Sequence, residues 1–106
     1  MTQHSWTAGD WINKGAEQLR QDPALAQRLI SRGLCQAPNS SVGWYNLGLA
    51  LHQQRRIEST IRAYRQALTQ PEPPLAEIQA NLSQDLLLAG TQGSRRHRTQ
   101  SGLASQ

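Results

Sequence analysis

The segment 44–71 constrains the fold most strongly, because two apolar stripes with helical spacing follow each other within it. The first stripe contains Trp44, Leu47 and Leu51, which recur at steps of three and four residues. Gly48 lies inside this stripe, and a glycine within a helix is expected where another helix approaches closely. The segment is therefore predicted to form two helices that fold back on each other. The second stripe consists of Ile57, Ile61, Tyr64, Ala67 and Leu68.

Residues of similar kind recur along the chain at a nearly constant distance. Gly15 and Gly48 are 33 residues apart, and Ile30 and Tyr64 are 34 apart. Ser83 follows Gly48 by 35 residues. Small side chains thus recur where antiparallel helices are expected to touch, and large ones where a helix must fill a gap. Further matched pairs are Trp11 and Trp44, Asn13 and Asn46, Ala26 and Thr60, Gly33 and Ala67, Leu34 and Leu68, Asn46 and Asn81, Leu47 and Leu82, and Leu51 and Leu86.

These periods bracket the 34-residue period of the tetratricopeptide repeat, and residues 7–90 resemble that family. The resemblance implies an all-α fold of five helices, in which antiparallel helix-turn-helix repeats stack as a short right-handed α-solenoid. The alternative is a generic bundle of helical hairpins whose glycines coincide by chance. The expected organisation is a flexible N-terminus (1–6), repeat 1 (7–40), repeat 2 (41–74), the first helix of repeat 3 (75–90) and a disordered basic tail (91–106).

Capping residues and prolines predict where the individual helices begin and end. Thr7 with Asp10 has the pattern of a capping box, and Asp22 before Pro23 is a second start signal. Gly90 is expected to end the fifth helix, whose leucines exceed what one neighbouring helix can bury. The predicted helices run from Thr7 to about Arg20, Asp22 to about Gln36, Ser40 or Ser41 to about Gln54, Ile57 to Gln70, and Pro74 to Ala89.

The charge of the chain is uneven. The net charge is +4, but residues 1–90 carry eight Lys/Arg and seven Asp/Glu, a difference of +1. Arg95, Arg96 and Arg98 are candidates for contact with a nucleic acid or an acidic partner, and the alternative is that this tail only aids solubility. The chain begins without a secretory signal pattern, and no apolar run is long enough to cross a bilayer. A soluble, cytoplasmic protein is therefore expected.

The family resemblance also implies a concave groove lined by the first helix of each repeat. Side-chain amides can match both the C=O and the N–H groups of an extended peptide, and the alternative is that they bond to their own neighbours. Tyr45 is the expected aromatic anchor, unless it and Leu49 merely pack between repeats. The predicted groove residues are Asn13, Tyr45, Asn46, Leu49, His52, Asn81 and Gln84.

The expected function is a non-catalytic scaffold that binds a protein or peptide, because the sequence shows no catalytic constellation. His4, His52 and His97 lack the spacing of metal ligands, and neither a metal nor another cofactor is expected. Self-association through the fifth helix is a further expectation. Two alternatives remain: an accessory or recruitment segment of a larger bacterial-type transferase, and helical-repeat RNA binding aided by the basic tail. Nucleic acid is the less favoured partner, because the groove candidates carry almost no positive charge.

Overall fold

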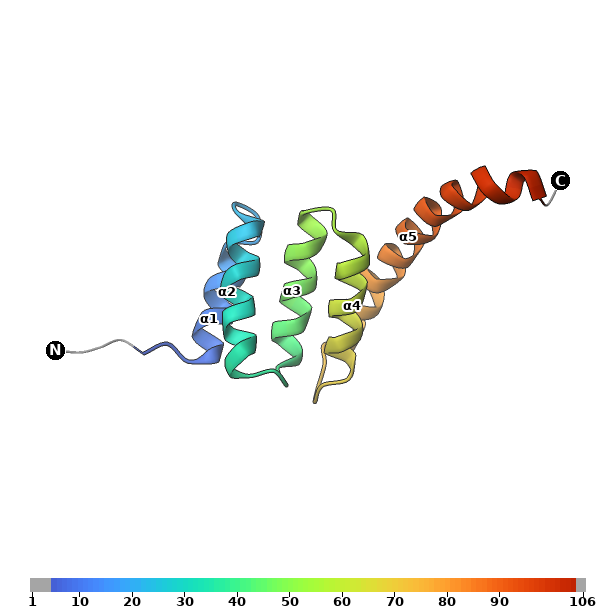
Figure 1. Cartoon of the computed structure of the whole chain (residues 1–106). Coiled ribbons are helices and arrows are strands. Elements are labelled where there is room, and N and C mark those ends of the chain that lie inside the picture. Colours follow the sequence, from blue (N-terminus) through green and yellow to red (C-terminus); the bar gives the residue numbers. More distant parts are fainter. Residues whose placement is uncertain (1–4, 105–106) are drawn as a thin grey trace.

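The computed structural model describes residues 5–104, with side chains described up to residue 90. All regular structure within this range is helical, and no strand is present in it. In Figure 1 the helices up to residue 68 follow one another across the molecule in sequence order, and the last helix runs away obliquely. The helices are α1 (Ala8–Glu17), α2 (Pro23–Gln36), α3 (Ser41–Gln53), α4 (Ile57–Leu68) and α5 (Leu75–Ala104).

Local side chains start the first three helices, as the sequence predicts. The Thr7 hydroxyl accepts a hydrogen bond from the backbone N–H of Asp10 at 3.1 Å, and Oδ2 of Asp10 accepts one from Thr7 N at 2.9 Å. Asp22 caps α2 in a similar way, with Pro23 at the start of that helix. Ser40 caps α3 through the backbone N–H of Gly43. These contacts satisfy N–H groups that a helix leaves unpaired at its start.

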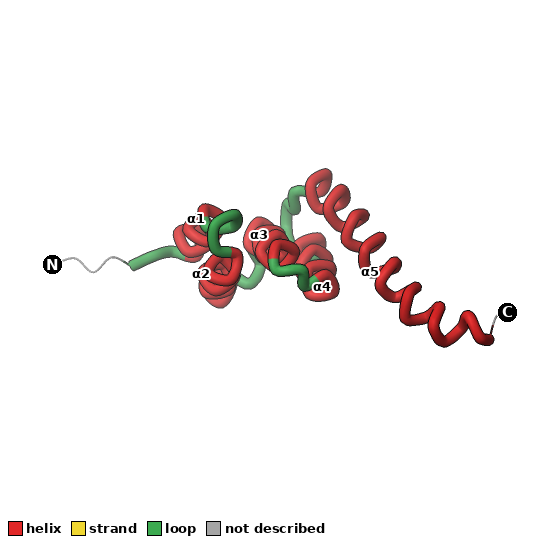
Figure 2. The backbone as a smooth tube through the Cα atoms, turned by 90° about the horizontal axis from the view of Figure 1, so that it is seen from above, coloured by secondary structure: helices red, strands yellow, loops and turns green. Residues whose placement is uncertain are grey.

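The helices form two rows when the molecule is seen from above. Figure 2 shows α1 and α3 in one row, α2 and α4 in the other, and the start of α5 beside α3 and α4. Each helix packs most extensively against its neighbours in the sequence. The two hairpins are the pairs α1–α2 and α3–α4, and the other close pairs are α2–α3 and α4–α5. For the described residues, an all-helical arrangement in which the second hairpin packs on the first and α5 packs on the second is therefore confirmed.

The predicted contacts between small and large residues lie at the centre of both hairpins. A Cβ atom on Gly15 would overlap the side chain of Ile30, and one on Gly48 would overlap the ring of Tyr64. Ile30 and Tyr64 are themselves fully buried. The same pairing therefore recurs in both hairpins, and in each it lets the two helices approach closely.

Two apolar clusters hold the hairpins together. Buried residues of α2 and α3 form the first, and residues of α4 and α5 form the second. Trp44 packs against both clusters, so it links the first hairpin to the second. The first cluster contains Ala26, Ile30, Leu34 and Ala50, and the second contains Tyr64, Ala67 and Ile78.

The ends of three helices differ from the prediction. Helix α1 ends at Glu17 and α4 at Leu68, a few residues earlier than expected. Helix α5 continues through Gly90 to Ala104, so its predicted end at Gly90 is wrong. No glycine among the described residues has a positive φ, so Gly90 does not form a left-handed cap. Residues 91–104 also lack proline, which would have stopped the helix.

Candidate functional site

A small hollow lies where α3, α4 and α5 meet. It encloses about 50 Å³ and is lined by residues from all three helices. Leu49, His52, Asn81 and Gln84, four of the predicted groove residues, are among those that line it. The sequence did not indicate the other two lining residues, Tyr64 and Asp85.

Asp85 is the most unusual residue of this hollow. Its side chain is 1% exposed, and its Oδ1 lies 2.8 Å from Nδ1 of His52. An ionised Asp85 only accepts hydrogen bonds, and the tautomer of His52 that pairs with it carries its proton on Nδ1. The other carboxylate oxygen, Oδ2, is buried without a hydrogen-bond partner. Leaving a buried polar atom unpaired costs about 1–3 kcal/mol, and more for a charged group.

The position of Asp85 on α5 explains why it is buried. Ile78, Leu82 and Asp85 follow at steps of four and three residues, so they share the helix face that packs against the rest of the molecule. Asp85 also lies 35 residues after Ala50, a fully buried residue of α3. An acidic residue within an apolar stripe was the signal that could have pointed to this site.

Tyr45 and Asn81 form a second link between α3 and α5. The Asn81 Nδ2 group donates a hydrogen bond to the Tyr45 hydroxyl at 3.2 Å. The Tyr45 ring stacks on Tyr64, with ring centroids 5.8 Å apart and an interplanar angle of 29°. Tyr45 and Leu49 both pack against the second apolar cluster, as the packing alternative expected. Asn81 is likewise engaged by a neighbour within the protein.

Burial raises the pKa of both tyrosine side chains. The pKa of Tyr64 rises mainly because the ring is buried, and the nearby carboxylate of Asp85 raises it further. Desolvation also raises the pKa of Tyr45, although the hydrogen bond from Asn81 counteracts part of this increase. Both phenols are therefore neutral hydrogen-bonding groups at neutral pH.

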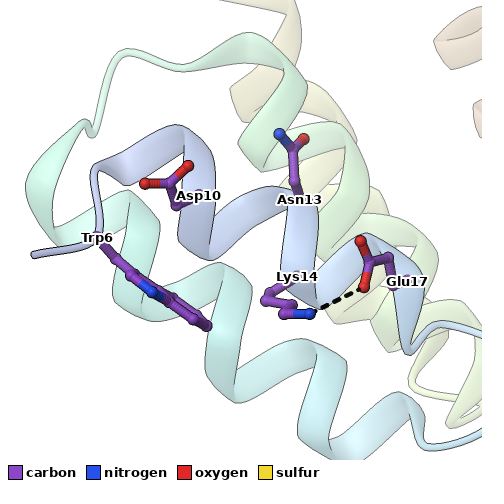
Figure 3. A pocket seen from close by; sticks show the side chains of 5 residues that line it. All are labelled: Trp6, Asp10, Asn13, Lys14 and Glu17. Atoms are coloured by element: carbon purple, nitrogen blue, oxygen red, sulfur yellow. Dashed lines mark hydrogen bonds and ion pairs between the residues drawn. The ribbon is translucent and has the colours of Figure 1, made fainter. Parts of the chain in front are cut away.

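The remaining predicted groove residues lie outside the hollow. Asn46 is partly buried on α3. Asn13 lies on α1 at a separate, open pocket, which it lines together with Trp6, Asp10, Lys14 and Glu17 (Figure 3). The structure therefore does not join Asn13 and Asn81 in one site. The side chains of Arg95, Arg96 and Arg98 lie outside the described part of the structure.

The pocket on α1 is an exposed surface feature. Lys14 Nζ and Glu17 Oε1 are 3.4 Å apart there, and both side chains are more than half exposed. Exposed ion pairs of this kind contribute about 0–1 kcal/mol. Trp6 packs edge-on against Trp11 with ring centroids 4.6 Å apart, and the Arg32 guanidinium lies 4.9 Å from the Trp11 ring. These contacts attach the segment before α1 to the first hairpin.

Among the described residues, no three His, Cys, Asp or Glu side chains are grouped in a way that could hold a metal ion. In the same part of the chain, no helix combines the length and apolar character needed to span a bilayer. No family model matches this sequence, and neither a curated protein nor a solved structure is significantly similar to it.

Proposed function

We propose that this protein is a non-catalytic interaction module that binds a segment of another protein along the face formed by α3 and α5. The observation that carries the proposal is the repeated hairpin geometry, with Gly15 against Ile30 and Gly48 against Tyr64. Equivalent hairpins stacked side by side present equivalent faces, and arrays of this kind typically bind partners along such a face. We further propose that the hairpins are tetratricopeptide-like and stack as a right-handed α-solenoid.

The chemistry of this face favours a protein partner over a nucleic acid. The hollow between α3 and α5 has polar lining residues, and neither Lys nor Arg is among them. A nucleic-acid site needs cations to neutralise phosphate groups. Partly buried Asn46 and exposed Gln53 and Gln84 instead offer amide groups, which can pair with the backbone of a peptide. RNA binding and a recruitment role within a larger transferase are therefore second to this proposal.

Affinity capture with two matched double variants tests the proposal. Asn46→Ala with Gln84→Ala removes two amides from the proposed binding face, whereas Gln36→Ala with Gln66→Ala removes two exposed amides from α2 and α4. The wild type and the α2/α4 variant are expected to retain the same partner from the cells that produce this protein. The α3/α5 variant should lose that partner while its circular dichroism spectrum is unchanged. Equal retention by all three proteins would contradict the proposed face.

A further inference from the structure

The unpaired oxygen of Asp85 indicates what the hollow between α3 and α5 can bind. Oδ1 is held by His52, so the carboxylate is fixed in orientation and Oδ2 remains without a partner. Asp85 lines the hollow, and its side chain is almost completely buried. A buried acceptor at a preformed hollow has the arrangement of a binding site that lacks its donor.

The other lining groups favour a donor that carries a positive charge. Asn81 uses its NH₂ group to bond with Tyr45, which leaves its amide oxygen as an acceptor. Gln84 contributes a second amide, and the ring of Tyr64 forms part of the wall. Aromatic faces attract cations, and carboxylate and amide oxygens accept their hydrogen bonds. Among the described residues, neither Lys nor Arg lines the hollow, so a ligand cation would meet no repulsion from these side chains within it.

The size of the hollow limits the ligand further. A volume of about 50 Å³ accommodates one or a few groups the size of a water molecule. A primary ammonium group has this size and carries three donors, whereas the planar guanidinium of arginine is larger and presents five. The partly exposed His52 side chain lies beside the hollow, and apolar Leu49 forms another part of its wall. These features match a ligand side chain that has an aliphatic stem and a charged group at its end.

We propose that this hollow binds the ammonium group of a lysine side chain in the partner segment, with Asp85 Oδ2 as the principal acceptor. The proposal rests on the proposed function, because it identifies which side chain the interaction face selects. Leu49 would contact the aliphatic stem, and the amide oxygens of Asn81 and Gln84 would accept the remaining hydrogen bonds. A partner with leucine or glutamate in place of this lysine would leave the carboxylate unpaired.

The test uses small probes and the full ¹⁵N-labelled chain, so it does not require the partner. Nα-acetyl-lysine N-methylamide is titrated while the side-chain amide signals of Asn81 and Gln84 are followed by NMR. The norleucine analogue has a similar stem without the charge, the arginine analogue has a guanidinium, and glycine N-methylamide has only an α-amine. The lysine probe should cause saturable shifts and bind at least tenfold more tightly than the other three.

Two variants assign the effect to Asp85. Asp85→Asn keeps the shape of the side chain and should weaken lysine binding at least tenfold. Glu77→Gln removes the same charge from an exposed position on the same helix and should leave binding unchanged. Equal shifts with lysine and norleucine, which would indicate that water alone satisfies Oδ2, would overturn the proposal. So would equal or tighter binding of the arginine or glycine probe.

The comparison of probes on the wild type decides the proposal even if Asp85→Asn fails to fold. The probe comparison and the capture experiment can also give different answers, so a failure of the lysine site can be distinguished from a failure of the binding face. Saturable lysine binding without partner loss in the α3/α5 double variant would contradict the proposed face and leave the lysine site intact. Partner loss in that variant without lysine binding would support the face and overturn the lysine site.

Discussion

Nδ1 of His52 lies 2.8 Å from Oδ1 of Asp85, and this contact joins α3 to α5 at a hollow between the two helices. The two residues are 33 positions apart in the sequence. Asp85 is buried, whereas the His52 side chain is 41% exposed. The contact therefore fixes one oxygen of the carboxylate, while the other is buried without a hydrogen-bond partner in a residue that lines the hollow. A buried polar group with an unpaired oxygen lowers the stability of the fold. Such a residue is expected at a position that serves binding rather than packing.

Asp85→Ala tests whether the buried carboxylate contributes to stability. Ala50 occupies the position 35 residues earlier, and it is also fully buried. The substitution removes an acceptor that lacks one partner, and His52 can be hydrated because it is partly exposed. The free energy of unfolding should therefore change by less than about 1 kcal/mol, as measured by urea denaturation. Ile78→Ala, at a fully buried apolar position of the same helix, should cost about 2–5 kcal/mol. A similar loss in both variants would show that Asp85 is required for stability.

Gly48→Ala tests the close approach of α3 and α4. The added methyl group would overlap the ring of Tyr64, and relieving this overlap should cost about 1–3 kcal/mol of unfolding free energy. Gly90→Ala is the matched control, because nothing lies within 4 Å of the added carbon. That substitution should be neutral or stabilise the helix by up to about 1 kcal/mol. Thermal unfolding followed by circular dichroism measures both effects, and equal melting temperatures would contradict the proposed helix contact.

The two tyrosines predict a loss of stability at alkaline pH. Both pKa values are raised in the folded protein, so above pH 10.0 the folded chain holds protons that the unfolded chain has released. The stability that the two protonated phenols contribute is therefore fully present below pH 10.0, and it is lost as the pH rises through their higher pKa values in the folded protein. Ultraviolet absorbance of the phenolate should show a higher titration midpoint in the native protein than in denaturant. Tyr45→Phe leaves only Tyr64 to titrate, and a midpoint equal to that of the unfolded chain would refute its burial.

The exposed leucines of α5 allow the predicted self-association to be tested. Leu75 and Leu86 are 11 residues apart, about three helical turns, and are 52% and 42% exposed. If the α5 helices of two copies pair through this face, sedimentation velocity should show a dimer at high concentration. Leu75→Gln with Leu86→Gln should abolish it. Leu88→Gln is the control, because this leucine is 44% exposed but lies on another side of the helix. A wild type that stays monomeric at every concentration would rule out this interaction.

The hairpins could be predicted from the sequence because their determinants are local and repeat along it. Apolar residues at helical spacing surround each glycine and its large partner in the sequence. The structure brings Gly15 against Ile30 and Gly48 against Tyr64. Helix starts were predicted for the same reason, since caps such as Thr7 act within one turn. The end of α5 was not predicted correctly, because glycine favours the end of a helix without imposing it.

The arrangement of side chains at the centre of the candidate site could not be predicted from the sequence, although an acidic residue within an apolar stripe marks the position of Asp85. Asp85 acquires its role from His52 and from the burial that α4 and α5 create together, and neither is a local property. The sequence leaves open whether Tyr45 is an aromatic anchor or packs between repeats, because spacing alone does not distinguish the groove side of a helix from its packed side. The structure shows the Tyr45 ring stacked on Tyr64 and its hydroxyl bonded to Asn81.

Site-specific photo-crosslinking in the producing cells tests the central claim most directly. A photoreactive amino acid replaces exposed Gln84 beside the hollow in one protein and exposed Gln66 on α4 in another. A partner segment bound between α3 and α5 should be crosslinked from position 84 and not from position 66. Mass spectrometry of the crosslinked product should locate a lysine of the partner next to the attachment point. Crosslinking from position 66 alone, or equally from both positions, would contradict binding at this face.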